Sequence, residues 1–159
     1  LAPLPNNLEE TINKLLPPRW SRNNPVDLAG GETRDTIPEL LSVASKHPEI
    51  DSIIQLGLGI QGNTANLVRT GKFYPEHGLE RIVNFHERQE KRYAEASIEV
   101  SLTSGKPVLV ASELAATQPN NPMVKTIRDS GRLCYISANR AVSALNHLVR
   151  YSGWRNQSN

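Results

Sequence analysis

The sequence contains one cysteine, few aromatic residues and no long run of apolar residues. Because a single cysteine, Cys134, cannot form an internal disulfide, disulfide-rich secreted folds are excluded and a reducing, cytoplasmic compartment is expected. No stretch approaches the roughly 18 consecutive apolar residues that indicate a membrane-spanning helix. The net charge is only +2, and no block of lysine and arginine is interleaved with aromatic residues. The sequence therefore predicts neither a nucleic acid nor a membrane as a partner.

The composition is that of an ordinary globular protein. Of the 159 residues, 38% are hydrophobic and 21% are charged, so the chain can bury a full core and does not resemble a disordered segment. Apolar segments bounded by glycine, proline and capping residues predict alternating strands and helices. We expect strands near residues 1–4, 25–29, 51–58, 108–111 and 133–136, and helices near 7–16, 36–47, 63–70, 79–103, 121–131 and 137–153. This alternation predicts an α/β fold with a parallel sheet and right-handed crossovers.

The stretch from Ile50 to Asn63 is the most informative part of the sequence. Its apolar, β-branched run passes directly into Gly57-Leu58-Gly59-Ile60-Gln61-Gly62 and then into Asn63, a residue type that caps helices. This order is typical of a buried parallel strand that delivers a loop to the carboxyl edge of a sheet. Ligands of open α/β sheets bind at that edge.

Three interpretations of this loop remain open. The spacing G-x-G-x-x-G occurs in dinucleotide-binding folds, but there it follows the first strand, and a strand ending in Asp or Glu comes about 20 residues later. Here it follows the third expected strand, and the next strand lies about 50 residues further on. The second interpretation is a tight strand-to-helix turn without a ligand. The third is an anion or phosphoryl site, in which the amides of Gly59–Gly62 bind negative charge at a helix N-terminus.

Gly30 and Gly31 form a second glycine turn after an expected strand. In a parallel sheet we expect this turn on the same edge as the Gly59–Gly62 loop, where the two would share a binding crevice.

Other residues that carry chemistry give weaker signals. The histidines His47, His77, His86 and His147 are scattered, without a partner carboxylate or metal-ligand spacing, so neither a metal site nor a catalytic residue is predicted. Cys134 lies in an apolar strand and is expected to be inert core. The charged residues in the middle of the longest helix are expected to form a solvated face with i,i+3 and i,i+4 pairs. They are Glu87, Arg88, Glu90, Lys91 and Arg92.

Several segments resemble one protein family. They are Leu15-Leu16-Pro17-Pro18-Arg19-Trp20-Ser21, Asn24-Pro25-Val26-Asp27-Leu28, Gly105-Lys106-Pro107-Val108-Leu109, and the stretch from Ala141-Val142-Ser143-Ala144-Leu145 to Tyr151-Ser152-Gly153-Trp154. In this order they resemble the ligase domain of the NDP-forming acyl-CoA synthetases, which include the ADP-forming acetyl-CoA synthetases and the succinyl-CoA synthetases. That domain follows the CoA-binding and phosphohistidine domains, and the resemblance covers most of the chain.

The resemblance implies a fold and a reaction. The fold is a three-layer, mainly parallel flavodoxin-like sheet with helices on both faces, formed by residues 1–159 as a single domain. In the reaction, acyl-CoA, NDP and phosphate are converted to acid, CoA and NTP through a phosphohistidine. The chain has no Gly-His-Ala-Gly-like segment and no ATP-grasp segment. We therefore expect ATP or ADP, CoA and Mg²⁺ to bind elsewhere in a parent enzyme, and the isolated chain to carry no catalytic residue, cofactor or activity.

The resemblance also implies a site and partners. In the family, the helix that follows the strand matching Ile53–Leu56 directs its N-terminus at the phosphohistidine. Carried over, the phosphoryl-binding residues are Gly59, Ile60, Gln61, Gly62 and Asn63, with Gly30 and Gly31 nearby. The expected partners are the CoA-binding, phosphohistidine and ATP-grasp domains of the same protein or complex.

The chain departs from the family pattern in three respects. The succinyl-type enzymes have adjacent glycines where this chain has Gly57-Leu58-Gly59, and the segment from Asn63 to Gly78 is longer than usual. The family's first strand and glycine turn are absent before Leu1, so we expect the chain to be a fragment of a larger multidomain protein. Two alternatives stay open, namely a non-catalytic ligase-like module of an acetyltransferase and a nicotinamide- or flavin-binding oxidoreductase domain.

Overall fold

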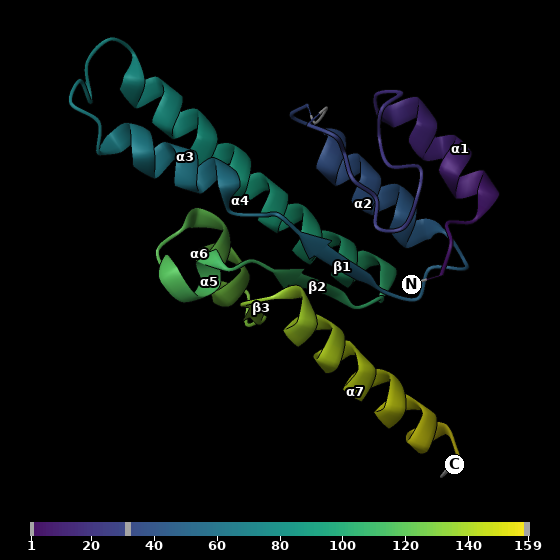
Figure 1. The fold of residues 1–159 in the computed structure, drawn as a ribbon. Coiled ribbons are helices and arrows are strands. Elements are labelled where there is room, and N and C mark those ends of the chain that lie inside the picture. The colour runs from purple at the N-terminus through teal and green to yellow at the C-terminus, as the bar shows by residue number, and fades with distance from the viewer. Residues whose placement is uncertain (1, 31–32, 158–159) are drawn as a thin grey trace. The chain divides into compact units, whose positions relative to one another are not determined.

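The computed structural model describes residues 2–30 and 33–157, which form an α/β protein (Figure 1). The elements are α1 (Asn6–Leu15), α2 (Thr36–Lys46), β1 (Ile53–Leu56), α3 (Ile60–Arg69), α4 (Leu79–Ser104), β2 (Val108–Ala111), α5 (Leu114–Thr117), α6 (Pro122–Asp129), β3 (Cys134–Tyr135) and α7 (Ala138–Gln157). The chain divides into two units. One comprises the chain up to Ile53 together with Glu99–Pro107, and the other comprises Ile54–Ile98 and the chain from Val108 onward.

The first unit is built around the apolar face of α1. Leu8, Ile12, Leu16 and Trp20 are buried together, and side chains of α2 pack against them. The apolar spacing of α1 is that of an amphipathic helix, so its burial follows directly from the sequence pattern. The Trp20 indole satisfies its buried N–H by donating to Asn13 Oδ1 at 2.9 Å.

Two expected strands are wrong within this unit. Residues 2–4 and 25–29 form no strand, and Leu1 lies outside the described residues. Val26 and Leu28 instead pack on the α1 cluster. The backbone of this segment is held locally, because Asp27 N–H donates to Ser21 Oγ at 3.0 Å and Ser21 N–H donates to the Asp27 carbonyl at 3.4 Å. Ser21 thus provides hydrogen bonds to this segment that a neighbouring strand would provide in a sheet.

The second unit contains a three-stranded parallel sheet with the order β1-β2-β3. Val110 pairs with Cys134 and Ala111 with Tyr135 in the β2–β3 register. All four residues of β2 are buried, as expected for a central parallel strand. The first half of α7 covers β2 and β3 through Ala141 and its neighbours. The predicted α/β fold with a parallel sheet is confirmed in this form.

Helix α6 begins as the sequence predicts. Asn121 Oδ1 accepts from Met123 N–H at 3.0 Å, and Pro122 occupies the first helical position. Two other boundaries differ from expectation, because α3 begins at Ile60 and not at Asn63, and α7 continues past Gly153 to Gln157. The earlier start of α3 places Gly59 at the N-cap.

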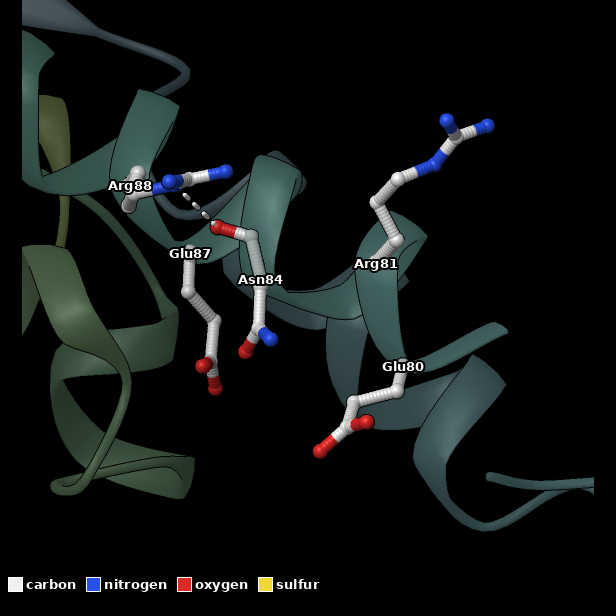
Figure 2. A pocket seen from close by; sticks show the side chains of 5 residues that line it. All are labelled: Glu80, Arg81, Asn84, Glu87 and Arg88. Atoms are coloured by element: carbon white, nitrogen blue, oxygen red, sulfur yellow. Dashed lines mark hydrogen bonds between the residues drawn. The ribbon is translucent and has the colours of Figure 1, made fainter. Parts of the chain in front are cut away.

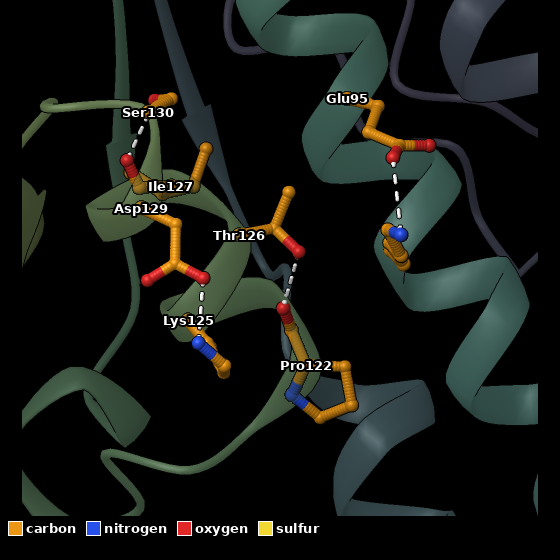
Figure 3. A network of polar contacts seen from close by, with 8 residues as sticks. Glu95, Pro122, Lys125, Thr126, Ile127, Asp129 and Ser130 are labelled. Carbon is orange, nitrogen blue, oxygen red and sulfur yellow. Dashed lines mark hydrogen bonds and ion pairs between the residues drawn. The ribbon is translucent and has the colours of Figure 1, made fainter.

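Exposed polar contacts on α4 and α6 are mostly local (Figure 3). Lys125 pairs with Asp129 at 2.6 Å and Lys91 with Glu95 at 3.6 Å, each one helical turn apart. The half-buried Thr126 hydroxyl donates to the Pro122 carbonyl at 2.7 Å. Exposed pairs of this kind contribute about 0.3–0.5 kcal/mol each, so they provide suitable control positions for the buried contacts described below.

Candidate functional site

The first turn of α3 lies immediately after β1, at the carboxyl end of that strand. Gly57 and Gly59 have positive φ values of 78° and 105°, a conformation that glycine adopts at little cost. These two residues turn the chain sharply out of the sheet and into the helix. The loop position predicted from the sequence is therefore the position that the structure shows.

Glycine is favoured at position 59 by the positive φ of 105° and at position 62 by close packing. A Cβ at Gly59 would lie 2.6 Å from Leu114 Cδ1, and a Cβ at Gly62 would lie 2.7 Å from Asn121 Nδ2 and 2.9 Å from Pro122 Cδ. Asn121 approaches so closely because its Nδ2 donates to the Gly59 carbonyl at 3.0 Å. The glycine spacing therefore has a structural explanation that involves no dinucleotide.

The amides of this turn converge on one carboxylate, that of Glu90 from α4. Gly59 N–H donates to Glu90 Oε1 at 2.7 Å, and Gly62 N–H donates to Oε2 at 3.0 Å. The Gln61 amide also acts as a hydrogen-bond donor to this carboxylate. Glu90 is 1% exposed, so it is a buried negative charge stabilised by amides and by the N-terminal end of the helix dipole. The first turn of α3 thus binds an anion supplied by the chain itself.

The position of Glu90 corrects one expectation from the sequence. Glu90 was expected on a solvated face of α4, but Val83, Glu90, Ala94 and Ser97 all lie on the buried side of that helix. These positions follow the spacing i, i+7, i+11 and i+14, which marks one face of an α-helix. The spacing alone could have indicated that Glu90 is buried.

A second polar contact joins the same two helices one turn earlier on α4. His86 Nδ1 is hydrogen-bonded to Gln61 Oε1, so residues i and i+4 of α4 both contact the first turn of α3. The side chain of Asn63 accepts from Gln118 Nε2 at 2.8 Å. The start of α3 is therefore held by side chains from α4 and from the segment after α5.

Burial raises the pKa of the Glu90 carboxyl above its ordinary value of 4.5, and the amides of Gly62, Gly59 and Gln61 oppose this rise only in part. A carboxyl whose pKa is raised by folding stabilises the fold most at low pH, and it loses that contribution as the pH rises through the folded-state pKa.

We therefore expect the difference in free energy of unfolding between the wild type and Glu90→Gln to fall as the pH rises above 4.5. The fall is at most about 1.4 kcal/mol per pH unit and ends above the folded-state pKa. Urea denaturation of both proteins over a pH series measures it. A difference that is constant or that increases with pH contradicts this prediction.

The structure places the predicted site residues in different surroundings. Gly59 and Gly62 are buried, Gln61 and Asn63 are half-buried, and Ile60 is exposed. Gly30 belongs to the first unit, with φ of 64°, and Gly31 lies outside the described residues. The shared crevice expected from Gly30, Gly31 and the Gly59–Gly62 loop stays a prediction.

The remaining candidate groups have ordinary surroundings. Cys134 is buried, and burial raises the pKa of its thiol. His47 Nε2 is hydrogen-bonded to Asn7 Oδ1 at 2.9 Å. Over residues 2–30 and 33–157, no group of three or more His, Cys, Asp or Glu side chains is arranged to hold a metal ion. Within the same residues, no buried side-chain nitrogen or oxygen lacks a hydrogen-bond partner, so no orphaned polar atom indicates a missing ligand.

A shallow pocket of about 350 Å³ lies along the outer face of α4 (Figure 2). Its lining residues all belong to α4: Glu80, Arg81, Asn84, Glu87 and Arg88. Glu87 is paired with Arg69 at 2.6 Å, and Arg88 Nε donates to the Asn84 carbonyl at 3.1 Å. Among the described residues the lining comes from one helix and mixes acidic with basic side chains, so this face has no marked preference for an anion or a cation.

Comparison of the chain with family models, with curated proteins and with solved structures gives no match. In the part of the chain that the structure describes, no helix is both long enough and apolar enough to cross a bilayer.

Proposed function

We propose that this chain is a domain of an NDP-forming acyl-CoA ligase and that the start of α3 faces the phosphohistidine carried by another domain. The observation that supports this proposal is the convergence of the Gly59, Gln61 and Gly62 amides on a single anionic group. Amides that are already aligned toward one point can stabilise negative charge without reorganising during a reaction.

The proposal includes the finer features of the family. The three-stranded sheet is then part of a three-layer, flavodoxin-like arrangement, and the partners are the CoA-binding, phosphohistidine and ATP-grasp domains. The phosphohistidine reaches the α3 turn at a high effective concentration, because it belongs to the same protein or complex. Glu90 aligns the amides while the phosphoryl group is absent.

The role of this chain in that reaction is to position the phosphoryl group. Backbone amides donate hydrogen bonds to a phosphoryl group but offer it no nucleophile. ATP, CoA and Mg²⁺ would bind to the partner domains, which supply the chemistry. This chain would hold the phosphorylated side chain in place between the half-reactions.

Binding of inorganic phosphate tests the proposal. At a pH above the folded-state pKa of Glu90, Glu90→Gln removes a negative charge beside the α3 amides. We therefore expect it to tighten phosphate binding about tenfold, which corresponds to about 1.4 kcal/mol of relieved repulsion. The measurement is the shift of the Gly59, Gln61 and Gly62 amide resonances in NMR spectra as phosphate is added. Glu95→Gln is the matched control, because it removes the same charge from an exposed position of the same helix. A Glu90→Gln protein whose three amides do not respond to phosphate contradicts the proposal.

A second candidate function is the non-catalytic ligase-like module of an acetyltransferase. The observation that favours it is that the three amides already have an acceptor, since the Glu90 carboxylate is fully buried against them. A module of this kind keeps the fold without needing a phosphoryl group. Absence of phosphate binding in Glu90→Gln, together with an acetyltransferase domain in the parent sequence, favours this candidate over the ligase.

A further inference from the structure

The second half of α7 consists entirely of exposed residues. Every residue from Asn146 to Gln157 is exposed, and this segment extends beyond the strands that the first half of α7 covers (Figure 1). At 1.5 Å per residue it is about 18 Å long. A helix of this length is marginal in water by itself, because helices in proteins obtain most of their stability from packing.

The exposed segment is rich in large apolar side chains. Leu148, Val149, Tyr151 and Trp154 are 51%, 62%, 59% and 62% exposed. The Tyr151 and Trp154 rings stack in a tilted pair with centroids 5.9 Å apart. Exposed apolar patches of this kind mark interaction surfaces, and tyrosine and tryptophan are common in the central residues of interfaces.

The apolar side chains are distributed over most of the helix circumference. With 3.6 residues per turn, Leu148, Val149, Tyr151 and Trp154 cover an arc of about 220°. A flat lipid surface contacts only one narrow side of a helix, so it would leave part of this arc in water. A protein groove that encloses the helix on several sides can cover all four side chains.

The charges of α7 indicate the chemistry of its partner. The helix carries Arg140, Arg150 and Arg155 and contains no aspartate or glutamate. Two copies of α7 packed together would bring arginines side by side without a carboxylate between them, and like charges at an interface are unfavourable. A complementary partner must supply acidic side chains.

We propose that the surface formed by residues 146–157 of α7, here called the α7 surface, docks into an apolar groove of another protein domain bordered by aspartate and glutamate. Leu148, Val149, Tyr151 and Trp154 fill the groove, and Arg150 and Arg155 pair with the acidic residues on its border. This inference rests on the proposed function only in taking the partner to be a domain of the same protein or complex.

Site-specific photo-crosslinking in the purified, intact parent protein or complex tests this inference. A photoreactive phenylalanine analogue replaces Trp154 in one protein and Leu67 in the control. Leu67 is an equally exposed apolar residue, at 64%, on helix α3. We expect the probe at position 154 to form crosslinks to an aspartate- and glutamate-rich segment of another domain, and the probe at position 67 to form none there.

Charge reversal completes the test. With the probe at position 154, the double substitution Arg150→Glu and Arg155→Glu is expected to lower the crosslink yield about tenfold, because like charges then face each other. Any one of four outcomes would overturn the inference. Two concern the crosslink itself, which could form to α7 of a second copy or not form at all. The other two are a crosslink yield that charge reversal does not change, and binding of vesicles of phosphatidylcholine and phosphatidylserine through α7. These outcomes do not depend on the phosphate titration, so failure of the α7 surface and failure of the phosphoryl site are distinguishable.

Discussion

Glu90→Ala is expected to lower the free energy of unfolding by about 3–5 kcal/mol. The substitution leaves the buried amides of Gly59 and Gly62 without an acceptor, and each unsatisfied buried donor costs about 1–3 kcal/mol. Relief of the buried charge offsets part of this loss.

The measurement is urea denaturation at pH 7 followed by far-ultraviolet circular dichroism. A loss of this size corresponds to a decrease of roughly 10 °C in Tm for a chain of this length. Glu95→Ala is the control, because it removes the same side chain from an exposed position, where the described ion pair is with Lys91 at 3.6 Å (Figure 3). We expect it to lower the free energy of unfolding by less than about 1 kcal/mol. If the two alanine variants are equally stable, Glu90 does not hold the start of α3.

Local sequence signals were sufficient for several elements of the fold. The apolar run of β2 between Gly105-Lys106-Pro107 and the following polar residues predicts a buried strand, and Val108–Ala111 is that strand. Asn121 followed by Pro122 predicts the start of α6, and the structure confirms it. In these cases, the residues that determine the element lie within or beside it.

Elements that depend on distant partners were not predictable in the same way. Val26 and Leu28 have the apolar character of a strand, but no neighbouring strand pairs with them in the described residues, and the Ser21 side chain satisfies the backbone locally. A β-propensity pattern indicates a half-buried extended segment and does not identify its hydrogen-bond partner. The side chains of Val26 and Leu28 are partly buried against the α1 cluster, but the expected strand is wrong.

The position of the glycine loop before α3 was predictable from the sequence, but the acceptor of its amides was not. The run Gly57–Gly62 indicates a helix N-terminus that follows a parallel strand, and α3 begins there. The acceptor of its amides is Glu90, about 30 residues further along the chain. Periodicity along α4 could have indicated that Glu90 is buried, but only the tertiary structure shows that its carboxylate reaches Gly59 and Gly62.

Gly62→Ala is expected to destabilise the protein by about 1–3 kcal/mol net, although alanine is the better helix former by about 1 kcal/mol. The opposing effect is steric, because the new Cβ would lie 2.7 Å from Asn121 Nδ2 and 2.9 Å from Pro122 Cδ. Asn121 is held on both sides, by its bond to the Gly59 carbonyl and by its capping bond to Met123 N–H. It therefore cannot move away without losing one of them, and such overpacking typically costs about 1–3 kcal/mol, with the broken bond adding about 1 kcal/mol.

The same substitution at a second helical glycine separates the two effects. Gly153 lies in α7, and a Cβ at this position would have no neighbouring atom within 4 Å. Gly153→Ala is therefore expected to cost nothing and to raise the helicity of α7. Thermal denaturation of both variants beside the wild type measures the contrast. If Gly62→Ala is as stable as Gly153→Ala, then Asn121 and Pro122 can adjust freely, and the close approach of α6 to the first turn of α3 is not the reason for a glycine at position 62.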